Sequence, residues 1–122
     1  MAPPQESRPP IVLVVDDDPV VRSFEEKALL AEGYRVITAG NGLSALEMLR
    51  SVGQVDLVVS DIEMPHLDGL ALVARLHALP SAPPVLLVSG LRHEGIESPH
   101  LQKPFTRDAL CDAVRDLLNQ LH

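Results

Sequence analysis

The sequence predicts an α/β fold built around a parallel β-sheet. Apolar runs at residues 11–15, 57–60 and 85–88 are continuous rather than alternating, as in strands with two buried faces. Helical patterns lie between the predicted strands, and a regular alternation of strands and helices favours a parallel sheet with right-handed crossovers. The chain has 122 residues, which fits a single domain.

Local signals delimit the elements. Asp18 followed by Pro19 predicts the start of a helix, with Asp18 as its N-cap, and Gly33 suits the position just after its end. Prolines after residue 79 break a later helical pattern. The remaining elements expected in chain order are a strand at 35–38, a helix at 43–51, a helix from about 69 to 79 and a last helix that reaches about 118.

The first ten residues differ from the rest of the chain. Residues 1–10 contain four prolines and no apolar run, so we expect a disordered lead-in or linker before a folded domain at 11–120. This stretch does not have the pattern of a signal peptide, and no later stretch approaches the length of a transmembrane helix. Cys111 is the single cysteine, which excludes an internal disulfide and fits the reducing cytoplasm where we expect the protein.

Charge narrows the range of partners. The formal net charge is −7, which argues against direct nucleic-acid binding because nucleic-acid phosphates would be repelled. An acidic excess suits cations or a basic partner surface, and it also promotes solubility without any ligand. We therefore expect neither nucleic acid nor a membrane as a direct partner.

Polar side chains follow the predicted strands where ligand sites of open α/β sheets lie, beyond the carboxyl ends. Clustered carboxylates repel one another unless a cation sits among them, and hard oxygen ligands suit Mg²⁺. A carboxylate can also attack phosphorus and form an acyl phosphate. Each residue alone has an ordinary explanation, Asp18 as a helix cap for example, but their joint placement is specific. The residues in question are Asp16, Asp17, Asp18, Asp61, Ser89 and Lys103.

Four stretches together resemble the receiver domain of two-component response regulators. These are VLVVDDDPVVR, DLVVSDIEMPHLDGL, VLLVSG and QKPF, each at its predicted strand end. The resemblance covers nearly the whole chain after residue 10. It implies a three-layer α-β-α fold of the flavodoxin-like or CheY-like kind, with a five-stranded parallel sheet in the order 2-1-3-4-5.

The resemblance also implies a role for each matching residue. Asp61 matches the phosphorylated aspartate. Mg²⁺ is then held by Asp16, Asp17, Asp61 and the backbone carbonyl of Glu63. Ser89 matches the switch hydroxyl, and Lys103 matches the lysine that contacts the phosphoryl group, joined to Pro104 by a cis bond. The implied phosphodonor is a phosphohistidine on a histidine kinase or a histidine phosphotransfer protein.

One departure from the family pattern concerns the fourth crossover. Thirteen residues separate Ser89 from Lys103, and part of this segment must form the fifth strand. Gly95 and Pro99 both oppose a helix interior. We therefore predict that the fourth helix is absent or reduced to about one turn. Because that helix helps to form the family's output and dimerisation face, output through the usual face is in question.

A second departure is His100, which stands where family members often carry an aromatic residue of the switch. It is a switch candidate, with a plain surface residue as the alternative. His93, Glu94, Glu97 and His100 lie close in sequence but match no structural zinc spacing, so a polar loop is the favoured interpretation. His66 is expected to be an exposed loop residue.

Three functions remain open at this stage. The leading one is a phosphorelay switch that accepts a phosphoryl group on Asp61 and changes a protein-interaction surface. It acts on a downstream protein or a covalently linked effector domain, with no turnover chemistry beyond self-catalysed phosphorylation and autodephosphorylation. The second is a phosphate-independent pseudo-receiver, and the third is a phosphatase or phosphotransferase with an aspartate nucleophile. The third is disfavoured because the usual nucleophile of such enzymes follows the first strand. The chain is either a stand-alone receiver or a piece of a longer regulator.

Overall fold

The computed structural model describes residues 8–96 and 98–120. Most of the predicted lead-in, residues 1–7, therefore lies outside the described part. The described residues form five strands and four helices, which alternate except that β5 follows β4 with no helix between them. In chain order these are β1 (Ile11–Val15), α1 (Pro19–Ala31), β2 (Arg35–Ala39), α2 (Gly42–Val52), β3 (Leu57–Asp61), α3 (Gly69–His77), β4 (Val85–Ser89), β5 (His100–Gln102) and α4 (Arg107–Asn119).

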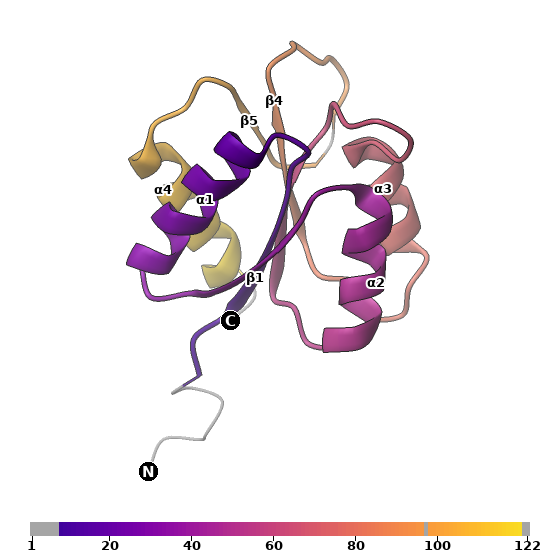
Figure 1. Cartoon of the computed structure of the whole chain (residues 1–122), viewed down its shortest axis with the longest axis horizontal. Helices are drawn as coiled ribbons and strands as arrows, with labels where there is room; N and C mark the ends of the chain where they lie inside the picture. Colours follow the sequence, from indigo (N-terminus) through magenta and orange to yellow (C-terminus); the bar gives the residue numbers. More distant parts are fainter. Residues whose placement is uncertain (1–7, 97, 121–122) are drawn as a thin grey trace.

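The strands form one parallel sheet in the order β2-β1-β3-β4-β5, which confirms the predicted topology. Figure 1 shows the sheet nearly edge-on, with α1 and α4 on one side and α2 and α3 on the other. The strand order reverses between β1 and β3, which are neighbours in the sheet. At such a switch point the helices that follow the two strands lie on opposite faces, so their carboxyl ends flank a crevice.

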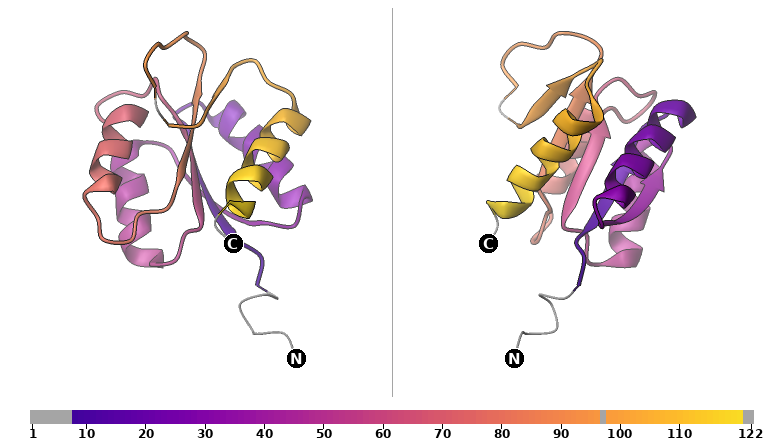
Figure 2. Two further views of the ribbon diagram at one scale, coloured as in Figure 1. Left: turned by 180° about the vertical axis from the view of Figure 1, so that it is seen from behind. Right: turned by 90° about the vertical axis from the view of Figure 1, so that its left-hand side faces the viewer.

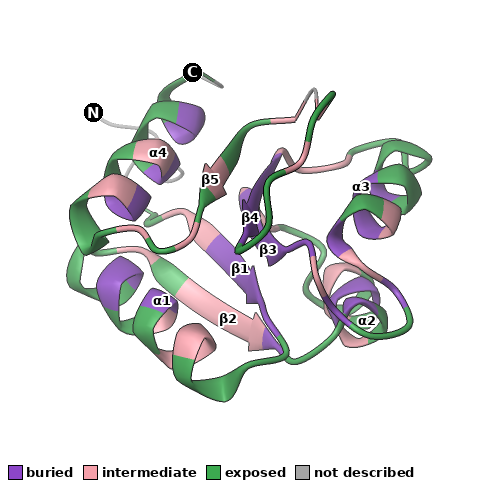
Figure 3. Cartoon of the chain, turned by 90° about the horizontal axis from the view of Figure 1, so that it is seen from above, coloured by how far each residue is buried: buried purple, intermediate pink, exposed green. Residues whose placement is uncertain are grey.

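The core lies on both faces of the sheet, as the continuous apolar runs predict. Along β1, Val12 and Val14 belong to the cluster beneath α1 and α4, whereas Leu13 and Val15 belong to the cluster beneath α2 and α3. All four side chains are fully buried. Figure 3 shows the same burial along β3 and β4, while the edge strand β2 is only partly covered. A strand buried on both faces can carry polar residues only at its ends.

Polar side chains begin the helices. Asp18 caps α1 by accepting a hydrogen bond from the Val20 N–H at 2.9 Å, which confirms its predicted role. Gly33 follows the end of α1 with φ of 95°, in the left-handed region that favours glycine. Asp68 caps α3 in the same way as Asp18 caps α1. In the part of the chain that the structure describes, no helix combines the length and the apolar character that crossing a membrane requires.

The segment between β4 and β5 contains no helix at its described positions, 90–96 and 98–99. Its missing crossover helix was predicted from its length and from Gly95 and Pro99. Gly95 has φ of 74°, a left-handed conformation that interrupts a right-handed helix. Figure 2 shows the segment as an open loop at the end of the molecule where the strands point. The loop leaves the outer strand β5, three residues long, without a helix of the fourth crossover beside it.

Gly69 is the first residue of α3, and it lies directly against the end of β3. A Cβ built at this position would lie 2.4 Å from the carbonyl oxygen of Asp61 and 2.8 Å from the Cα of Ile62. The Gly69 N–H also donates a hydrogen bond to the Ile62 carbonyl at 2.9 Å. The close approach therefore ties the position of α3 to the backbone of Asp61.

We expect Gly69→Ala to lower the free energy of unfolding by about 1–3 kcal/mol, because the added methyl group must displace backbone atoms. Urea denaturation of the two proteins measures the difference. Gly90→Ala is the matched control, since a Cβ at Gly90 meets nothing within 4 Å. Equal losses in the two variants would mean that the close approach at Gly69 is not the cause.

Candidate functional site

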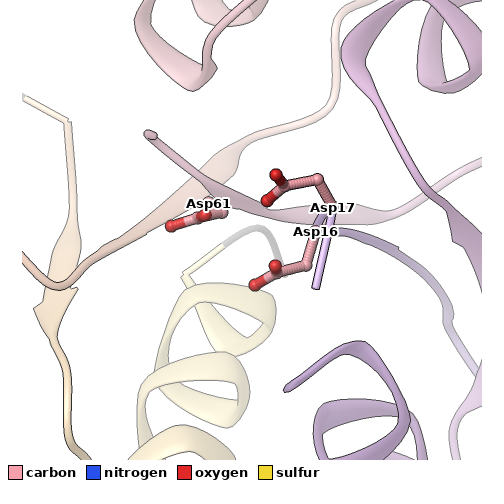
Figure 4. A group of neighbouring side chains, drawn as sticks. All are labelled: Asp16, Asp17 and Asp61. Carbon is pink, nitrogen blue, oxygen red and sulfur yellow. The ribbon is translucent and has the colours of Figure 1, made fainter. Parts of the chain in front are cut away.

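Three carboxylates gather at the carboxyl ends of β1 and β3. Val15 pairs with Ser60 in the sheet, so the residues that follow, Asp16 and Asp61, come side by side. One carboxylate oxygen from each of Asp16, Asp17 and Asp61 lies within 4.8 Å of the other two. Figure 4 shows the three side chains as neighbours. Asp16 and Asp61 are buried, whereas Asp17 is exposed. The cluster therefore offers a metal ion two buried carboxylates and one carboxylate at the solvent-facing side.

Lys103 supplies the cation at this site. Its Nζ lies 3.3 Å from Asp16 Oδ2 and 3.3 Å from Asp61 Oδ1. The pairing of β4 with β5 positions this lysine, and the backbone N–H of Lys103 continues the pairing by donating a hydrogen bond to the Ser89 carbonyl at 2.7 Å. The Lys103–Pro104 peptide bond is cis. Lysine and carboxylates thus come from three different strand ends, and the ammonium group bridges the two buried carboxylates.

The site holds three carboxylates and one ammonium group, so it carries more negative charge than Lys103 neutralises. Burial and the neighbouring Asp16 carboxylate raise the pKa of Asp61 to about 6, although Lys103 acts in the opposite direction. Burial alone would lower the pKa of Lys103, but the two aspartates outweigh it and raise that pKa. A divalent cation beside the carboxylates would relieve their repulsion, and three carboxylate oxygens are the ligand type that Mg²⁺ prefers. The donor set is therefore compatible with a Mg²⁺ site.

Ser89 and Glu63 lie beside the aspartate cluster, Ser89 at the end of β4 and Glu63 on the loop that follows β3. The Ser89 Oγ is buried and lies 2.7 and 2.8 Å from the two carboxylate oxygens of Glu63. The same carboxylate accepts the Gly90 N–H at 3.1 Å and lies 2.7 Å from His93 Nε2. The Ser89 hydroxyl is thus oriented by the Glu63 side chain in this structure.

Two further histidines, His66 and His100, are exposed at the surface. His100 is exposed, and its Nδ1 is 3.3 Å from the backbone carbonyl of Ser98, so the predicted switch candidate has a surface environment here. His66 is exposed in the loop before α3, as expected. Of the proposed polar loop cluster, Glu97 lies outside the described residues. In the described part of the loop no group of histidines and carboxylates has metal-binding geometry.

Sequence reasoning missed two features of the site. The contacts of the Glu63 side chain with Ser89, Gly90 and His93 were not predicted. Glu25, on α1, is almost completely buried near the charges of Asp16, Asp61 and Lys103, and its Oε2 has no hydrogen-bond partner. A signal for Glu25 existed, since it lies three and four positions before the buried Ala28 and Leu29 and so shares their helix face.

Comparison with known proteins agrees with this arrangement. The family model described as the response regulator receiver domain matches residues 12–115. The transcriptional regulatory protein GlrR of Escherichia coli (strain K12) is 34% identical over 93% of this chain. The crystal structure of the receiver domain from the hybrid histidine kinase CckA is 32% identical, with a TM-score of 0.78, and covers 88% of this chain and 98% of that one. The signal receiver domain of an HD domain-containing protein from Pseudomonas fluorescens Pf-5 is 29% identical, with a TM-score of 0.84 and coverage of 93% and 97%.

The fold and the acidic crevice thus define a CheY-like receiver, a signalling domain of two-component systems. The chain belongs to the response regulator receiver domain family. It spans only 27% of the length of GlrR, so the activity of that longer protein does not transfer with the similarity. Relatives of this chain include response regulators and a sensor kinase, and receiver domains take part in phosphorelay signalling rather than in the turnover of a small substrate.

Proposed function

We propose that this domain accepts a phosphoryl group on Asp61 from a phosphohistidine of a histidine kinase or phosphotransfer protein. The observation that carries the proposal is the position of Lys103, whose ammonium group lies 3.3 Å from the carboxylate of Asp61. This ammonium can neutralise phosphoryl oxygens as they arrive at the aspartate.

The transfer moves one phosphoryl group and leaves Asp61 phosphorylated, as an acyl phosphate. An Asp61 oxygen attacks phosphorus, the P–N bond of the phosphohistidine breaks, and the leaving imidazole nitrogen keeps the electron pair and takes up a proton. Autodephosphorylation reverses the state when water attacks phosphorus and the P–O bond breaks. The products are then inorganic phosphate and the Asp61 carboxylate.

Asp16, Asp17, Asp61 and the backbone carbonyl of Glu63 are the residues that would hold Mg²⁺. The ion would supply charge neutralisation for the phosphoryl oxygens. Asp16 is fully buried beside Asp61, so its carboxylate stays fixed at the site. Ser89 supplies a hydroxyl that can turn toward a phosphoryl oxygen, and Lys103 supplies an ammonium that is already in place.

A phosphate-independent interaction module is the second candidate. The observation that favours it is the missing helix between β4 and β5, which changes the face next to the switch residue Ser89. The complete set of Asp16, Asp61 and Lys103, joined by two ion pairs, favours phosphorylation instead. The downstream partner, whether a separate protein or a linked effector domain, would recognise the altered face.

Intact-mass measurement after incubation with acetyl phosphate tests the proposal. We expect a single phosphoryl adduct that requires Mg²⁺ and is absent in Asp61→Asn, because the amide is a far poorer nucleophile than the carboxylate. Asp68→Asn is a matched control, since Asp68 caps α3 and lies outside the aspartate cluster. An adduct of equal yield in Asp61→Asn would assign the modification to another residue. No adduct from acetyl phosphate or a phosphohistidine donor would favour the phosphate-independent module.

A further inference from the structure

The Glu63 carboxylate links the loop after β3 to the end of β4 and the loop that follows it. It lies in the loop after β3, and its partners Ser89, Gly90 and His93 all belong to the end of β4 and the loop that follows. The shortest of these links are 2.7 Å, between the Oε2 atom and both Ser89 Oγ and His93 Nε2. A single side chain therefore fastens the helix-free loop to the loop beside Asp61.

The geometry around the Glu63 carboxylate defines the direction of these hydrogen bonds. Its two oxygens lie within 2.7–3.1 Å of the Ser89 hydroxyl, the Gly90 N–H and His93 Nε2, and a carboxylate only accepts hydrogen bonds from such groups. The Ser89 Oγ also lies 2.8 Å from the Leu91 carbonyl oxygen, but both anionic oxygens of Glu63 are at least as close, so the hydroxyl proton is directed to the carboxylate. A hydroxyl has one proton, which means that Ser89 cannot donate to Glu63 and to a phosphoryl oxygen at once.

We propose that Glu63 and His93 form a latch that withholds the Ser89 hydroxyl from the phosphorylation site until a phosphoryl group on Asp61 competes for it. His93 acts as a positioning residue, because its bond to Glu63 holds the carboxylate against Ser89. The latch deepens the proposed function and rests on it. When Ser89 turns to the phosphoryl oxygens, Glu63 loses that partner, and the loop keeps only the links through Gly90 and His93, which loosens its attachment.

The surroundings of the latch allow the loop to move without disturbing the core. A cavity of about 330 Å³ lies beneath it, lined by both Ser89 and His93. The second attachment of the loop is Ile96, a partly buried side chain that packs against the core cluster beneath α2 and α3. Between the two attachments, Leu91, Arg92 and Glu94 are exposed or line the cavity. Release of the latch therefore frees the stretch from Gly90 to Gly95 and reshapes the cavity.

Two backbone amides report directly on the latch. The Gly90 N–H donates to Glu63 Oε1 at 3.1 Å, and the Leu91 N–H donates to Ser89 Oγ at 3.0 Å. Both amides should be protected from hydrogen exchange while the latch is closed and should exchange faster once it opens. Residue-resolved hydrogen exchange by NMR can follow them in the intact chain, together with the rate of phosphorylation by acetyl phosphate.

The variants are His93→Ala and Glu63→Ala, each compared with wild type. Glu94→Ala is the matched control, because Glu94 is the exposed neighbour of His93 and makes no hydrogen bond within the described residues. Without a phosphodonor, we expect about tenfold faster exchange at Gly90 and Leu91 in the two latch variants, because Glu63→Ala removes the acceptor of Gly90 and His93→Ala loosens the carboxylate that holds Ser89, the acceptor of Leu91. We also expect faster phosphorylation of His93→Ala, since Ser89 is already free, and no change in Glu94→Ala.

Phosphorylated wild type should show the same faster exchange as the unphosphorylated latch variants. The latch is refuted if exchange at both amides is unchanged in His93→Ala, or if an adduct forms on wild type while its Gly90 and Leu91 exchange stays slow. Failure of the proposed function looks different, because no adduct then forms on any variant. The donor-free comparison of His93→Ala with wild type still decides whether the latch exists in that case.

Discussion

Replacement of Glu25 by leucine is expected to stabilise this protein by roughly 4 kcal/mol at pH 9. Burial, and then the neighbouring Asp16 carboxylate, raise the pKa of Glu25 to about 8, from an ordinary value of 4.5. Each pKa unit corresponds to about 1.4 kcal/mol of free energy, so ionisation of Glu25 in the folded protein carries a large cost. Its buried Oε2, which has no hydrogen-bond partner among residues 8–96 and 98–120, adds to that cost. Leucine removes both and fills the space with apolar atoms.

The pH dependence of stability should identify Glu25 as the source. In the unfolded chain the carboxyl loses its proton near pH 4.5, whereas in the folded protein it keeps the proton up to about pH 8. Its contribution to stability is therefore fully present below pH 4.5 and is lost as the pH rises to about 8. The slope from this one group approaches about 1.4 kcal/mol per pH unit.

Urea denaturation at pH 5, 7 and 9 measures this slope in wild type, Glu25→Leu and Glu25→Gln. The glutamine variant is the matched control: it cannot ionise, so it should lose the slope, but it keeps a buried polar group and should gain less stability than the leucine variant. A slope in Glu25→Leu that equals that of wild type would show that another group titrates in this range. Any stability that Glu25→Leu gains would then come from burying apolar atoms and not from removing an ionisable group.

The sequence predicted the parts of this protein that depend on periodicity and on strand order. Continuous apolar runs located β1, β3 and β4, because only residues buried on both faces lose all alternation. Once strand order was inferred from the family resemblance, Asp16, Asp61 and Lys103 had to meet, since the carboxyl ends of parallel strands share one edge. The absent helix after β4 followed from chain length together with Gly95 and Pro99.

Features that depend on side-chain packing were beyond the same reasoning. The link between Glu63 and His93 spans 30 positions and depends on the path of an irregular loop, which no periodic pattern specifies. Glu25 sits among the charged residues of the sequence FEEK, where composition suggests an exposed face. Its helical spacing to Ala28 and Leu29 indicates a buried position instead, so the residue type and the spacing gave opposite predictions. Such a conflict between a residue type and its position is itself a useful indication of an unusual site.

Lys103→Met is expected to slow phosphorylation by acetyl phosphate by about 100-fold or more, the cost typical of removing a preorganised group that stabilises transition-state charge. Methionine keeps the length and apolar stem of the side chain but removes the ammonium that lies 3.3 Å from both Asp16 and Asp61. The pKa of Asp61, already raised to about 6 by burial and Asp16, should rise further because Lys103 is what holds it down.

Two measurements separate these effects in one experiment. The phosphorylation rate is followed by intact mass between pH 5 and 8 and should be lower in Lys103→Met at every pH. On acidification the rate falls as Asp61 takes up a proton, and the pH at which half of the rate is lost should be higher in Lys103→Met than in wild type. Lys27→Met is the matched control, because Lys27 is exposed on α1 and is the only other lysine of the chain. A rate that falls with no change in the pH midpoint would mean that Lys103 binds the phosphoryl group without controlling the ionisation of Asp61. An unchanged rate would remove Lys103 from the chemistry and leave its two ion pairs with a structural role.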